Sequence, residues 1–109
     1  MSDIGQMRKA LIARILEGSG VAGRILRRAA FDNLGLSKPT STLIDKVVHH
    51  ASMVVDEDIA AVRASGLSED EMFELVVCAA VGQAARQYDV ALGALDTALA
   101  APGTVSGKR

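Results

Sequence analysis

Hydrophobic residues recur every three or four positions along most of this chain, which is the spacing of one face of an α-helix. The pattern predicts five helices, over residues 4–17, about 21–33, about 40–53, 56–66 and 69–100. No stretch of the sequence shows the alternating polarity that is typical of a β-strand. The predicted fold class is therefore all-α.

Residues that favour helix ends coincide with the breaks between these stretches. Gly18 and Gly20 follow the first helix, and glycine readily adopts the left-handed conformation of a helix C-terminus. Pro39 moves the residue before it out of the helical region, which predicts a loop before the third helix. Ser68 and Glu71 have the spacing of a capping box and are expected to open the last helix.

The last predicted helix contains a segment, Phe73 with residues 75–82, that is apolar on every side. Such a segment belongs in the centre of a fold or at a subunit interface. Because a chain of 109 residues has few other elements to cover it, we expect a homo-oligomer. Residues 1–100 are predicted to form one domain, and residues 101–109, which lack periodicity, a disordered tail.

Charge and composition exclude several function classes. The 12 basic and 13 acidic residues give a net charge of -1, which does not favour binding to nucleic acid. No apolar run approaches the roughly 20 residues of a membrane span, and the N-terminus lacks the pattern of an export signal. We therefore expect a cytoplasmic protein without a nucleic-acid or membrane partner.

The charges are unevenly distributed, with a net +4 over residues 1–50 and −5 over residues 51–109. Attraction between the two halves is expected to support helix packing or contacts between subunits.

The chain offers little for redox or metal chemistry. Cys78 is the only cysteine, which excludes an internal disulfide, and its apolar neighbours predict a buried core residue. His49 and His50 point about 100° apart on a helix, so they cannot readily chelate one metal ion. We expect neither a metal nor a cofactor. His49 lies one turn from Asp45 and is expected to pair with it on the surface.

The stretch from Asp56 to Leu99, "DEDIAAVRASGLSEDEMFELVVCAAVGQAARQYDVALGALDTAL", with the preceding "KVVHHASMV" and the earlier "RRAAF", resembles the carboxymuconolactone decarboxylase-like, alkyl hydroperoxidase D-like superfamily. The most specific part is a short helix ending in "RASGLSEDEMFEL", a Gly-Leu-Ser hinge before a long alanine-rich helix. The resemblance implies an all-helical fold that assembles as a trimer or a multiple of a trimer.

The chemistry of that family depends on a CxxCxxxH motif and an upstream glutamate. Counted back from Gly66, the two cysteine positions fall on Ala51 and Val54, the histidine position on Asp58, and the glutamate position near Pro39. A peroxidase of this type needs an exposed thiolate with a second thiol one turn away. The resemblance therefore implies the fold without the redox activity, and peroxidase activity at the single thiol is a distant alternative.

His50 is the nearest group to these positions that exchanges protons near neutral pH. It shares a predicted stripe with Leu43 and Val47, where it would be either a hydrogen-bonded histidine at the edge of the core or an acid–base group. The candidate catalytic residues are His50, Asp56 and Asp58. In this role, one of the carboxylates would face the imidazole across the break between the third and fourth helices. Capping of the fourth helix is the alternative role of Asp56.

Two functions are consistent with these residues. The first is binding of a small molecule, or acid–base chemistry of the decarboxylase or isomerase kind, in an oligomer. The second is a non-catalytic oligomeric scaffold or regulatory protein.

Overall fold

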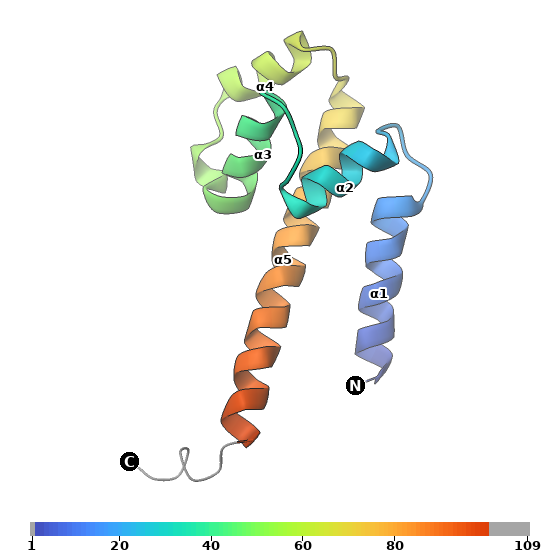
Figure 1. Cartoon of the computed structure of the whole chain (residues 1–109). Helices are drawn as coiled ribbons and strands as arrows, with labels where there is room; N and C mark the ends of the chain where they lie inside the picture. The colour runs from blue at the N-terminus through green and yellow to red at the C-terminus, as the bar shows by residue number, and fades with distance from the viewer. Residues whose placement is uncertain (1, 101–109) are drawn as a thin grey trace.

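The computed structural model of the chain describes residues 2–100, and within them it contains helices and no strand. In chain order the helices are α1 (Ser2–Glu17), α2 (Arg24–Asp32), α3 (Thr40–His49), the short 3₁₀ helix η1 (Ala51–Met53), α4 (Asp56–Ala64) and α5 (Glu69–Ala100), as Figure 1 shows. The predicted all-α class and the five α-helices are confirmed for this part of the chain. The predicted disordered tail, residues 101–109, lies outside the described residues.

Helix α2 begins at Arg24 and not at Val21, because backbone N–H groups before Arg24 form hydrogen bonds with a side chain of α5. The N–H groups of Val21 and Ala22 donate to the Glu74 carboxylate on α5, at N–O distances of 2.8 and 2.9 Å. These two residues therefore belong to the linker between α1 and α2, which Glu74 fixes to α5.

The prediction that the third helix continues to about Met53 is wrong. α3 ends at His49, and the backbone of His50 leaves the helical region, with φ −148° and ψ 58°. Helix α3 buries its first residue, Thr40, and then Leu43, Ile44 and Val48. In contrast, η1 buries no residue. Another α-helical turn would gain no packing, which explains why the helix stops.

Asp56 is the first residue of α4 and not its cap. Val55 occupies the N-cap position in an extended conformation, and the Asp58 carboxylate accepts its N–H at 2.9 Å. The predicted capping box of α5 is confirmed. The Ser68 N–H donates to Glu71 Oε1 at 2.9 Å, and the Glu71 N–H donates to Ser68 Oγ at 3.1 Å.

The helices α2, α3 and α4 pack around the N-terminal half of α5 to form a head. One core cluster joins the end of α1 to α2, α3 and α5, and a second joins α3, α4 and α5. The first contains Leu16, Ala22, Ala30, Phe31, Ile44, Val48, Leu75, Cys78 and Ala79, and the second Leu43, Val62 and Met72.

The end of α2 approaches α5 most closely at Gly82. A Cβ atom on Gly82 would overlap the carbonyl oxygen of Phe31. One turn later, Arg86 Nη1 donates to the same oxygen at 2.6 Å. Gly82 thus allows α2 to lie close to α5, and the hydrogen bond from Arg86 holds it there.

The segment expected to be apolar on all sides, Phe73 with residues 75–82, is buried on one side only. Leu75, Cys78, Ala79 and Gly82 are buried, whereas the Phe73 side chain is 68% exposed. The expectation of burial therefore holds for one face of this segment.

Two helical arms project from the head, α1 and the C-terminal part of α5, which we call the distal arm (residues 87–100) (Figure 1). They run antiparallel, and Arg8 joins them through a 2.8 Å ion pair with Asp89 and a guanidinium 5.2 Å from the centre of the Tyr88 ring. The radius of gyration is 17.6 Å, against about 13 Å for a compact chain of this length. The arms account for this elongated shape.

Candidate functional site

His50 is one of the residues that line an open hollow where the end of α2 meets α3. The hollow has a volume of about 530 Å³ and is lined by Asn33, Lys38, Ser41, Thr42, Asp45, Lys46 and His50. Asn33 Nδ2 donates to Asp45 Oδ1 at 3.1 Å across it. Two lysines, a histidine and two hydroxyl groups in this lining could bind a small anionic molecule, with Lys46 already paired with Asp58 and the Asp45 carboxylate opposing an anion.

The structure does not join His50 to the two predicted carboxylates. Asp56 is exposed in the first turn of α4, and the Asp58 carboxylate accepts from Lys46 Nζ at 2.9 and 3.1 Å. The hydrogen bond from the Val55 N–H, followed by the one from Lys46, lowers the pKa of Asp58. Lys46 lines the hollow and is the link between the carboxylate and the His50 region.

His50 itself is exposed, so the alternative of a packed histidine at the edge of the core is wrong. Its position follows from the early end of α3, which takes it off the face of Leu43, Ile44 and Val48. The predicted surface pair is confirmed, since His49 Nε2 lies 3.7 Å from Asp45 Oδ1 and both side chains are exposed.

Cys78 is a core residue, as its neighbours predict. It is 1% exposed, its Sγ lies 3.9 Å from the carbonyl oxygen of Ile15, and burial raises the pKa of its thiol. A protonated, enclosed thiol does not have the accessible thiolate that peroxide reduction requires.

Two charged residues have structural roles that sequence reasoning missed. Arg27 is 5% exposed, and its Nη1 donates to the carbonyl oxygens of Gly18 at 2.8 Å and Ile15 at 3.2 Å. Glu74 holds the α1–α2 linker, and the hydrogen bonds from Val21 and then Ala22 lower its pKa. Their partners are remote in sequence or on a linker without periodicity, so no local pattern reveals them.

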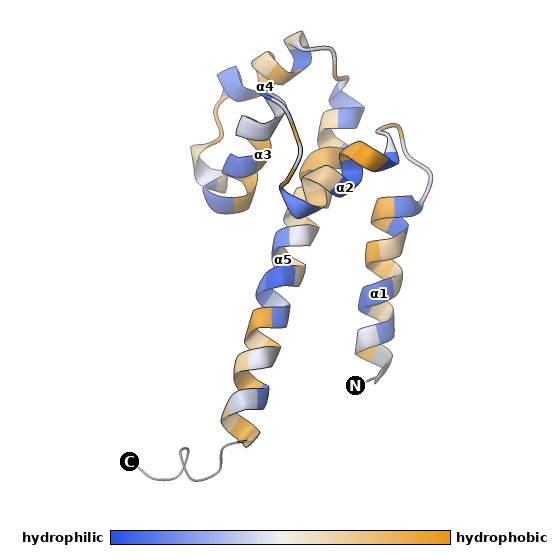
Figure 2. Cartoon of the chain, in the orientation of Figure 1, coloured by the Kyte–Doolittle hydropathy of each residue, from blue (hydrophilic) through white to orange (hydrophobic). Residues whose placement is uncertain are grey.

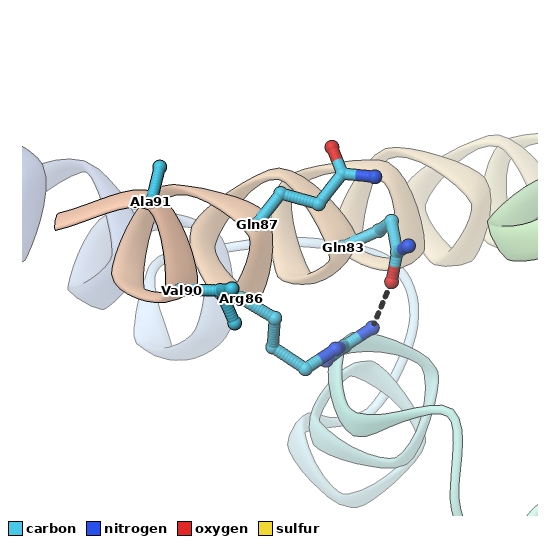
Figure 3. Close-up of a pocket in the computed structure, with 5 residues that line it drawn as sticks. All are labelled: Gln83, Arg86, Gln87, Val90 and Ala91. Carbon is cyan, nitrogen blue, oxygen red and sulfur yellow. Dashed lines mark hydrogen bonds between the residues drawn. The ribbon is translucent and has the colours of Figure 1, made fainter. Parts of the chain in front are cut away.

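A second hollow, of about 440 Å³, follows one flank of α5 and is drawn in Figure 3. All of its lining residues belong to α5: Gln83, Arg86, Gln87, Val90 and Ala91. Arg86 Nη2 donates to Gln83 Oε1 at 3.2 Å, and the arginine side chain extends toward the end of α2. A hollow lined by a single helix covers a ligand on one side only.

A third hollow, of about 250 Å³, lies between α1 and the part of α5 that leads into the distal arm, and it is mostly apolar. Its walls are Arg8, Leu11 and Ile12 of α1 with Val81, Ala84, Ala85 and Tyr88 of α5. We call it the inter-arm groove.

The distal arm carries a stripe of exposed apolar side chains. Every residue from 87 to 100 is exposed, and Tyr88, Leu92, Leu95 and Leu99 follow one another at spacings of four, three and four. This is the repeat of a coiled-coil seam, in which two helices pack their apolar stripes together. We call these four residues the α5 seam. Figure 2 shows hydrophobic residues along this arm and along α1.

Among residues 2–100, no helix has both the length and the apolar character that crossing a membrane requires. Within the same residues, no group of three or more His, Cys, Asp or Glu side chains is placed to hold a metal ion.

Comparisons of this chain with protein-family models, with curated proteins and with solved structures find no match. The likeness to the carboxymuconolactone decarboxylase-like superfamily therefore stays a prediction that rests on the sequence motifs quoted above.

Proposed function

We propose that this chain is a non-catalytic, self-associating helical protein of the cytoplasm and that the α5 seam is its assembly surface. The observation that carries the proposal is the exposure of the seam on an arm of 14 residues, 87–100, which rises from 41% at Tyr88 and 40% at Leu92 to 71% at Leu99. A lone helix of about 12–15 residues is only marginally stable in water, and an exposed apolar stripe favours association. Pairing of seams supplies the packing that the arm lacks within its own chain.

The proposal predicts that Leu95→Glu reduces the mass in solution from a multiple of 11.4 kDa toward 11.4 kDa. A charge in the seam must be desolvated when the seam is covered, which opposes association. The measurement is light scattering coupled to size-exclusion chromatography at micromolar concentration. Thr97→Glu is the matched control, because Thr97 lies two residues along the arm and off the seam. A monomeric wild-type protein would refute the proposal.

A second candidate function is binding of a small anionic molecule in the His50 hollow. The observation that favours it is the grouping of Lys38, Lys46 and His50 beside the hydroxyl groups of Ser41 and Thr42. This is the acid–base or ligand-binding role that the family resemblance implies, with Lys46 in place of a direct contact between His50 and a carboxylate.

For this second function, His50→Gln is expected to leave the melting temperature within about 1 °C of the wild type, because an exposed side chain contributes little to stability. It should also abolish any rise in melting temperature produced by small mono- and dicarboxylates. Differential scanning fluorimetry measures both effects. His49→Gln is the control, since His49 does not line the hollow. If no carboxylate raises the melting temperature of the wild type, the hollow is not an anion site.

A further inference from the structure

We infer that the partner of the α5 seam is a second copy of this chain, and that the two distal arms pair antiparallel about a two-fold axis between Leu92 and Leu95. The inference rests on the proposed function and adds the partner and the geometry of assembly.

The seam has a spacing that reads the same in both directions. Tyr88, Leu92, Leu95 and Leu99 are separated by four, three and four positions, so reversing the helix reproduces the pattern. In an antiparallel pair, Tyr88 then lies opposite Leu99 of the second copy, and Leu92 opposite Leu95. This spacing lets the stripe pair with a reversed copy of itself about a two-fold axis, with both copies presenting the same patch.

The flanks of the seam fit the same arrangement. On one side, the positions beside the seam are alanines, Ala91 and Ala98, which allow two helices to approach closely. On the other side they are Asp89 and Asp96. An acidic flank disfavours an anionic membrane surface as the occupant of the seam.

The helix dipoles favour the antiparallel direction over the parallel one. Asp89 pairs with Arg8 of its own α1, whereas Asp96 lies one turn from the end of α5, where the helix dipole is also negative. Parallel arms would place two such negative ends side by side. Antiparallel arms separate these two negative ends and place Asp96 on the flank where the second copy carries Asp89, whose charge Arg8 already pairs.

α1 supplies the rest of the surface. Ile4, Arg8, Leu11 and Ile15 also follow spacings of four, three and four, and Leu11 and Arg8 line the inter-arm groove. Ile4 and Leu11 are each 52% exposed, so their own α5 covers them only in part. Two pairs of antiparallel arms, one pair from each copy, complete a four-helix bundle in which the tip of each α5 lies over the inter-arm groove of the other copy.

The test combines mass with disulfide trapping. Light scattering should give a dimer of the 11.4 kDa chain. Tyr88→Cys protein mixed with Leu99→Cys protein and oxidised should form a disulfide-linked heterodimer, because the two positions are opposed. Leu99→Cys alone should not cross-link, because the two copies of residue 99 are offset by 11 residues, about 16 Å of helix rise, and a disulfide needs Cα atoms within about 7 Å.

A second pair, Leu92→Cys mixed with Leu95→Cys, reads the same register at the centre of the arm, in case Tyr88→Cys loosens the arm. Wild-type protein, whose Cys78 is buried, is the control and should give no cross-link. Cross-linking of Leu99→Cys with itself, or a trimeric or hexameric mass, overturns the antiparallel pair while self-association stands. A monomeric mass overturns both the inference and the proposed function.

Discussion

Replacing Gly82 by alanine is expected to lower the free energy of unfolding by about 3 kcal/mol, the upper part of the usual range for overpacking. The new Cβ atom would overlap the carbonyl oxygen of Phe31, which is a backbone atom and cannot rotate away as a side chain can. To make room, the end of α2 must move off α5. That movement also lengthens the hydrogen bond from Arg86 to the same oxygen, which is 2.6 Å in the native protein.

Gly93→Ala is the matched control for this prediction. Gly93 lies on the same helix, and a Cβ atom there would meet nothing within 4 Å. Because alanine favours the helix more than glycine does, this variant should be more stable than the wild type by about 0.5–1 kcal/mol. Urea unfolding followed by far-UV circular dichroism measures both changes. Stabilisation by both alanines would contradict the close approach of α2 to α5.

The helices were predictable because the signals that specify them are local. The 3–4 periodicity identified all five, and the capping box at Ser68 and Glu71 placed the start of α5. The start of α2 was missed because Glu74, about 50 residues away, accepts the N–H groups of Val21 and Ala22. No pattern within the linker reports such a partner.

The candidate site was less predictable because it depends on how one helix ends. The periodicity continued past His50, and it was the absence of packing for Ala51–Met53 that ended α3 and left His50 exposed. The pairing of Asp58 with Lys46 is also tertiary, since it joins α4 to α3. By contrast, the self-complementary seam of α5 can be read from the sequence, but that it is left uncovered emerges only from the fold.

Arg27→Met is expected to lower the free energy of unfolding by about 3 kcal/mol, because it removes two hydrogen bonds from a charged donor at a buried position. Arg27 Nη1 donates to the carbonyl oxygens of Gly18 and Ile15 at 2.8 and 3.2 Å, where α1 ends. Carbonyl groups at the end of a helix have no partners within the helix, so they need a donor from elsewhere. Methionine preserves the apolar stem but supplies no donor.

Arg28→Met is the control for Arg27→Met. Arg28 is the next residue on α2, exposed, and paired with Asp32 at 3.0 Å one turn away. An exposed pair of this kind is worth only about 0.3–0.5 kcal/mol, so the control should lose little stability. Equal losses in the two variants would contradict the capping role of Arg27.

Arg27→Met should also change the response of the protein to acid, through Glu74. The hydrogen bonds from Val21 and Ala22 lower the pKa of Glu74 most, and the positive charge of Arg27 lowers it further. A carboxylate with a lowered pKa in the folded state stabilises the fold above its unfolded pKa, and this contribution is lost as the pH falls through the folded pKa. Without Arg27 the folded pKa moves back toward the ordinary value of 4.5, so part of that stabilisation is absent at neutral pH and the remainder is lost at a higher pH.

Urea unfolding measured between about pH 3 and 7 should therefore show a smaller total loss of stability on acidification for Arg27→Met than for Arg28→Met. If the two variants lose the same amount of stability on acidification, the charge of Arg27 is too far from Glu74 to lower its pKa.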